Sequence, residues 1–193
     1  MRSFDPRAVG ALECRAWVTY YRREWLAFLL SAVRLVRHTF GLSWPRTLVG
    51  AWWVLRANQV WAPYPDNRPD LARRYMRRFY DLVARGSAEL FDPQEAARLE
   101  VDWWRVHREI QRGPGPADPA AVERLVAALQ ALYAYTYGAA PDAVRLAAQE
   151  RAEAMRLSDG WVRDGADPAS PVIPRERAAL VRSYAALLVA VHQ

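Results

Sequence analysis

One stretch of the sequence combines a carboxylate, an indole and an imidazole at helical spacing. Glu100, Trp104 and His107 are separated by four and then three residues within "QEAARLEVDWWRVHREI" (94–110). Residues so spaced share one face of an α-helix, here along the margin of an apolar stripe. Histidine exchanges protons near neutral pH, and a carboxylate can orient its ring. We therefore predict His107 as a general acid or base with Glu100 as its partner. A structural histidine at the edge of a core fits the same pattern.

A second polar group lies in the segment 44–62, which is apolar nearly all round. Trp52, Arg56 and Gln59 share a face of this segment at spacings of four and three. An arginine in an apolar environment needs a carboxylate, a phosphate or several carbonyl groups as partners. Arg56 is therefore expected to meet either Glu100 or a bound anion.

The segment 141–160 places a further cation in an apolar sector. Arg151 lies among small alanines, and Ser158 follows one heptad later. The space around such a long cation suits either a neighbouring helix or a ligand. We predict an interhelical pocket for a small anionic, partly apolar molecule such as a carboxylate, a phosphate ester or an acyl group. Its predicted lining is Trp52, Arg56, Gln59, Trp104, Arg151 and Ser158. The alternative is that Arg56 and Arg151 form structural ion pairs with protein carboxylates.

Other kinds of site lack their motifs. The chain has a single cysteine, Cys14, and neither HExxH nor a Glu-x-x-His pair, so no metal site is expected. No glycine-rich nucleotide-binding motif or G-x-S-x-G occurs. The sequence therefore identifies no cofactor, and it leaves open whether the protein is an enzyme.

Charge is distributed unevenly along the chain. All 27 basic residues are arginine, and the formal net charge is +6. Residues 1–90 hold 15 arginines against 7 acidic residues, whereas residues 91–193 hold 12 against 14. The alternative function is therefore an interaction module whose arginine-rich N-terminal half docks an acidic protein, nucleic acid or an anionic membrane surface. The string "RRYMRRFY" (73–80) argues against nucleic acid, because its aromatic residues and its arginines project from opposite sides of a helix.

The periodicity throughout is helical, and Pro, Gly and Asp mark the breaks. Seven helices are expected, at 6–40, 44–62, 69–90, 93–112, 119–138, 141–160 and 174–193. We predict an all-α, single-domain bundle over 1–193, arranged around the Trp-rich segment 44–62 as its central helix. No apolar run approaches the roughly 20 residues of a membrane span, and no signal peptide is recognisable, so a cytoplasmic protein is expected. The apolar C-terminal run "YAALLVAV" (184–191) is a candidate face for homo-oligomer formation, with core packing as the alternative.

Overall fold

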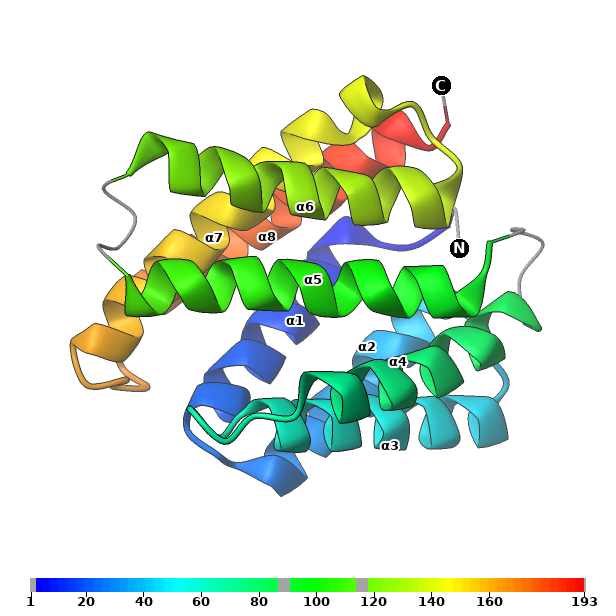
Figure 1. Cartoon of the computed structure of the whole chain (residues 1–193), viewed down its shortest axis with the longest axis horizontal. Helices are drawn as coiled ribbons and strands as arrows, with labels where there is room; N and C mark the ends of the chain where they lie inside the picture. The colour runs from blue at the N-terminus through cyan, green and yellow to red at the C-terminus, as the bar shows by residue number, and fades with distance from the viewer. Residues whose placement is uncertain (1–2, 87–90, 114–117, 193) are drawn as a thin grey trace.

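The computed structural model describes residues 3–86, 91–113 and 118–192, and within them the protein is all-α (Figure 1). Its described part contains eight α-helices and one short 3-10 helix, and no strand. The helices are α1 (Pro6–Tyr21), α2 (Trp25–Phe40), α3 (Trp44–Trp61), α4 (Pro69–Ala84), α5 (Pro93–Arg112), α6 (Pro119–Tyr137), α7 (Arg145–Arg163) and α8 (Val172–Ala190), with η1 (Pro141–Val144) before α7. The fold class predicted from the sequence is confirmed.

Aspartate–proline pairs fix three of the helix starts. The side chains of Asp5, Asp92 and Asp118 each accept a hydrogen bond from the backbone N–H two residues further on, and proline occupies the next position. At the other ends of α2 and α6, Gly41 and Gly138 adopt the left-handed conformation that glycine tolerates best. These boundaries agree with the sequence prediction.

The predicted first helix is in fact two helices. The chain breaks between α1 and α2 at residues 22–24, where Arg23 has a φ of 60°. Arg23 Nη2 donates to the carbonyl of Ala62 at 2.9 Å, and Arg22 Nε donates to Glu24 at 2.7 Å. These contacts stabilise a turn that contains neither glycine nor proline, and α2 folds back against α1. The predicted extension of α4 to residue 90 falls partly on 87–90, outside the described residues.

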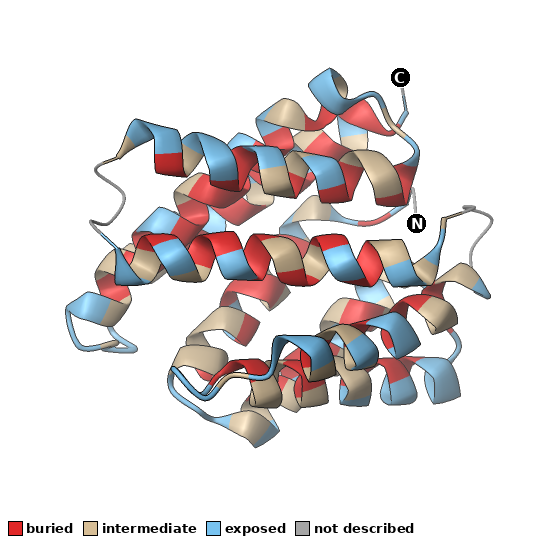
Figure 2. Cartoon of the chain, viewed as in Figure 1, coloured by how far each residue is buried: buried red, intermediate tan, exposed pale blue. Residues whose placement is uncertain are grey.

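The Trp-rich helix α3 is not at the centre of the molecule. It packs between α2 and α4 at the edge of the fold (Figure 1). Trp44 and Trp52 are 60% and 47% exposed, and Leu48 and Val49 are exposed as well. The prediction assumed that a helix with apolar residues on all sides is buried, but one apolar side of α3 faces outward. Helix α5 packs between α4 and α6, and nine of its 20 residues are buried (Figure 2).

Two three-helix groups are joined by two single helices. In one group α3 packs on both α2 and α4, and in the other α7 packs on both α6 and α8. Helix α1 contacts α2 and α8, and α5 contacts α4 and α6, so these two helices connect the groups on opposite sides (Figure 1). Buried residues of all eight helices belong to one hydrophobic cluster. The prediction of a single domain over 1–193 remains an expectation.

Candidate functional site

A cavity of about 190 Å³ lies where the two helical groups face each other across α1 and α5. Every one of the eight α-helices contributes to its lining. Most of the wall is apolar or aromatic. The polar exceptions include Glu13 from α1, Glu100 from α5 and Arg151 from α7. The cavity therefore combines an apolar interior with a small set of charged groups, as ligand sites commonly do.

Arg151 is the cation of this cavity. Its residue is only 9% exposed, and it donates hydrogen bonds to a carboxylate oxygen of Glu13 and, at 2.8 Å, to the hydroxyl of Tyr133. The guanidinium carbon lies 5.2 Å from the centre of the Trp103 ring and 5.8 Å from that of Trp17. Within the described part of the chain, neither Arg151 Nε nor the second oxygen of Glu13 has a hydrogen-bond partner of ordinary geometry, although the Tyr184 hydroxyl lies close to the Glu13 carboxyl group. Arg151 is thus paired through both of its terminal nitrogens, and its Nε is fully buried.

Glu100 forms the second polar group of the cavity. Its carboxylate accepts a hydrogen bond from the hydroxyl of Tyr80 at 2.9 Å and another from the indole nitrogen of Trp104 at 3.1 Å. Burial raises the pKa of Glu100 more than the charge of Arg151 and these hydrogen bonds lower it, so the pKa lies above its ordinary value. Glu100 is therefore easier to protonate than a glutamate at the surface.

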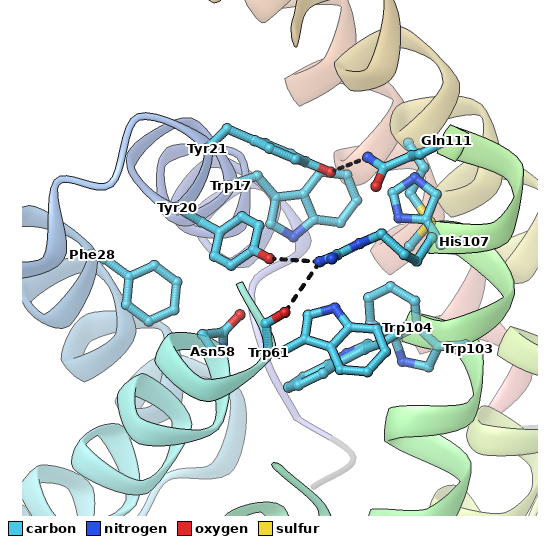
Figure 3. A pocket seen from close by; sticks show the side chains of 12 residues that line it. Trp17, Tyr20, Tyr21, Phe28, Asn58, Trp61, Trp103, Trp104, His107 and Gln111 are labelled. Atoms are coloured by element: carbon cyan, nitrogen blue, oxygen red, sulfur yellow. Dashed lines mark hydrogen bonds between the residues drawn. The ribbon is translucent and has the colours of Figure 1, made fainter. Parts of the chain in front are cut away.

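A smaller compartment of about 80 Å³ adjoins the cavity (Figure 3). Both spaces are lined by Trp17, Phe28, Asn58, Trp103 and Trp104. The compartment adds polar side chains to these shared walls, among them His107 and Gln111 of α5.

His107 and Gln111 converge on one buried carboxylate. His107 Nε2 lies 3.1 Å from each carboxylate oxygen of Asp159. Gln111 Nε2 lies 2.6 Å from Asp159 Oδ1 and 2.8 Å from the Tyr21 hydroxyl, and it donates to both. His107 and Asp159 are 8% and 4% exposed. Asp159 therefore orients the imidazole in the way that a catalytic histidine requires.

A basic hollow of about 280 Å³ lies outside the compartment. It shares Tyr20, Tyr21, Arg108 and Gln111 with the compartment, and its lining also includes Arg23, Arg112 and Arg163. Arg108 lines both spaces, and it donates to the Tyr20 hydroxyl at 3.3 Å and to the Trp61 carbonyl at 3.4 Å. The three spaces are contiguous. The basic hollow adjoins the aromatic compartment, and the compartment adjoins the central cavity that contains Arg151.

Some of the site residues predicted from the sequence lie together in the structure, and others do not. Glu100, Trp104 and Arg151 line the central cavity, as a shared site requires. His107 lies in the adjoining compartment, where Trp104 is a common wall. The expected pairing of His107 with Glu100 is not formed, because α7 presents Asp159 to the imidazole.

The predicted α3 residues Trp52, Arg56 and Gln59 lie outside the cavity. Arg56 Nη1 donates to Gln59 Oε1 at 2.7 Å, and its guanidinium carbon lies 5.8 Å from the centre of the Tyr75 ring. Trp52 is 47% exposed. The expected contact of Arg56 with Glu100 is absent, because the part of α3 that faces the cavity carries Val54 and Asn58 instead.

Ser158 belongs to a separate buried cluster. It lies against the carboxyl group of Glu176, together with Cys14. Ser158 and Glu176 are each 0% exposed, and Cys14 is 3% exposed. Ser158 is absent from the lining of the three successive spaces.

Sequence reasoning missed Glu13, Tyr133 and Asp159. Glu13 had a usable signal, since it lies four residues before Trp17 and next to Cys14 in an apolar sector. A carboxylate in such a sector needs a buried partner, and Arg151 was the cation without one. Asp159 had no comparable signal, because its partner His107 is 52 residues away in the sequence.

The described residues lack two further features. They contain no group of three or more histidine, cysteine, aspartate or glutamate side chains arranged to hold a metal ion. None of the helices in this part of the chain has the length and apolar character needed to cross a membrane. No protein-family model, curated protein or solved structure matches the chain.

Proposed function

We propose that the protein binds a small monocarboxylic acid with a compact apolar body in the central cavity. The ligand carboxylate would lie against Arg151 and Glu100, and its apolar body would pack among Trp17, Trp103 and Trp104. The observation that carries this proposal is the buried Arg151 in the wall of a largely apolar cavity that it shares with the carboxyl group of Glu100. A charge-assisted hydrogen bond to a carboxylate is stronger than one to a neutral acceptor, so a guanidinium in the cavity wall favours an acid.

The volume of the cavity limits the size of the ligand. An apolar cavity of about 150 Å³ can hold benzene. The 190 Å³ available here therefore suits one aromatic ring or a short acyl chain bearing a carboxylate. A phosphate ester fits less well, because its second negative charge would face Glu13 and Glu100 with only Arg151 to balance them.

Acid–base chemistry at His107 is a second part of this proposal. A ligand held at Arg151 and extending past Trp104 would present its far end to the imidazole. Asp159 would orient the ring and stabilise the imidazolium, so His107 could take up a proton at Nδ1. Glu100 would then bind the carboxyl end of the ligand and would not orient His107.

The test uses benzoate and butyrate as probes and tryptophan fluorescence with calorimetry as readouts. Ala32→Leu places a larger side chain at a 2% exposed position in the cavity wall, and the exposed Ala131→Leu on α6 is its matched control. We expect the wild type and A131L to bind a probe with equal affinity, and A32L to remain folded but lose binding at least tenfold. Absence of binding by the wild type, or equal binding by A32L, would contradict the proposal.

A further inference from the structure

The exposed apolar side chains of the protein are concentrated on two adjacent helices. Among the described residues, nine large apolar side chains are exposed, and six of them belong to α2 and α3. These six, named here the α2–α3 face, are Leu26, Leu30, Trp44, Leu48, Val49 and Trp52. The exposed fraction reaches 74% at Leu26. Single exposed apolar residues are normal, whereas a concentration of them indicates a surface that contacts something else.

The members of the face follow the helical repeat. Leu26 and Leu30 are four residues apart on α2, and Trp44, Leu48 and Trp52 are four residues apart on α3. The two helices are consecutive in the sequence and pack against each other. Each helix therefore carries a continuous exposed stripe.

The same two helices carry positive charge only. Residues 25–61 contain Arg34, Arg37, Arg46 and Arg56, and not one aspartate or glutamate. Arg37 lies over the Trp44 ring, with its guanidinium carbon 5.3 Å from the ring centre, so a cation borders the apolar stripe directly. The neighbouring helix α4 adds the exposed Arg78, whose guanidinium carbon lies 4.7 Å from the centre of the Trp53 ring on α3.

This combination of exposed apolar side chains and arginines favours one kind of partner over a second copy of the chain and over nucleic acid. If a second copy of the chain docked on the same face, arginines of the two copies would come together. Helices α2 and α3 of neither copy carry a carboxylate that could neutralise them. Nucleic acid would meet the arginines through its phosphates but would leave the exposed leucines without apolar contact. An anionic lipid surface satisfies both features, because leucine and tryptophan enter the acyl boundary while arginine meets the headgroup phosphates.

We propose that the α2–α3 face attaches the protein to an anionic membrane surface without crossing it. The helices would lie in the plane of the interface, with the apolar stripes buried among the lipids. This surface is separate from the central cavity, whose lining does not include Leu30, Trp52 or Arg34. The attachment therefore does not depend on the proposed binding of a carboxylic acid.

The test is flotation of the full chain with vesicles of phosphatidylcholine alone and of phosphatidylcholine mixed with phosphatidylserine. We expect flotation only with the anionic vesicles, weakened by salt. Leu30→Glu combined with Trp52→Glu should abolish it. The control combines Leu146→Glu with Val189→Glu, since both residues are also exposed but lie on α7 and α8, and it should float like the wild type.

A second pair of variants tests the role of charge. Replacing Arg34 and Arg46 by glutamine should weaken binding by about fivefold for each arginine removed. The same change at Arg124 and Arg175, two exposed arginines of α6 and α8, should have little effect. Circular dichroism would check that each variant folds.

Several outcomes would overturn this proposal. Equal flotation with neutral and anionic vesicles would show that the arginines are not needed for attachment. No flotation with either kind of vesicle would show that the α2–α3 face does not bind a membrane. A concentration-dependent dimer that is lost in the Leu30→Glu/Trp52→Glu variant would assign the face to a second copy of the chain. Tight binding to an acidic protein or to nucleic acid without vesicle binding would assign it to that partner.

Discussion

Glu176 offers the most direct test of how this interior is built. The side chain is 0% exposed on α8, and neither carboxyl oxygen has a hydrogen-bond partner of ordinary geometry in the described part of the chain. Burial raises the pKa of Glu176 to about 8, against the lowering effect of nearby Cys14 and Ser158. The ordinary pKa of a glutamate in an unfolded chain is 4.5. The folded protein therefore keeps a proton on Glu176 over a range of pH in which the unfolded chain has lost it.

This difference makes stability depend on pH with a definite sign. Because the pKa of Glu176 is higher in the folded state, its stabilising effect is fully present below about pH 4.5 and is lost progressively up to about pH 8. The difference between the two pKa values corresponds to a change of about 5 kcal/mol in the free energy of unfolding. That is a large share of the roughly 5–15 kcal/mol that stabilises a typical domain.

Glu176→Gln removes this titration while keeping the shape of the side chain. The measurement is urea unfolding of both proteins between about pH 5 and about pH 9. The wild type should lose stability relative to the variant as pH rises, by about 4 kcal/mol over this range, because part of the loss occurs below about pH 5. Glu123→Gln, at an exposed carboxylate on α6, is the control and should run parallel to the wild type within about 1 kcal/mol. A difference between wild type and E176Q that does not change with pH would refute the reasoning.

Three further predictions concern the cavity and the helix contacts. Since the pKa of Glu100 is raised and a bound carboxylate should raise it further, benzoate affinity should fall as pH increases, and Glu100→Gln should remove that dependence in calorimetric titrations at several pH values. Arg151→Met should lower the free energy of unfolding by about 3–5 kcal/mol because it leaves Glu13 buried without its cation, and adding Glu13→Gln should recover part of this loss in urea titrations. Gly10→Ala should destabilise the protein by about 1–3 kcal/mol, because its methyl group would come within 2.8 Å of the α8 backbone, whereas Gly160→Ala, which has room, should be neutral or stabilising in thermal unfolding.

The helices were predictable where the signal is local. Asp5, Asp92 and Asp118 stand before prolines, and a capping aspartate with proline behind it starts a helix whatever surrounds it. The break at Arg23 was not predictable, because its left-handed conformation is stabilised by a hydrogen bond to Ala62, which is 39 residues away. Local propensity contains no information about such a contact.

The site was predictable only in part, for a related reason. Glu100 and Arg151 could be found because each is a charged residue in an apolar sector of its own helix. Their partners Tyr80 and Glu13 are contributed by other helices, and the Glu13–Arg151 pair spans 138 residues of sequence. Arg56 was wrongly placed inside because apolar composition cannot tell a buried helix from one with an exposed apolar face.

A purely structural role for the buried charges leaves part of their arrangement unexplained. A buried ion pair seldom stabilises a protein more than apolar residues of the same volume would, because removing two charges from water is costly. A pair that only fixed helix packing would be expected to be enclosed by side chains, with no cavity beside it. Here Arg151 and Glu13 line a cavity of about 190 Å³ together with a third charged residue, Glu100. A ligand acid in this cavity would lie against the Arg151 guanidinium, which would give the position of the pair in the cavity wall a role beyond helix packing.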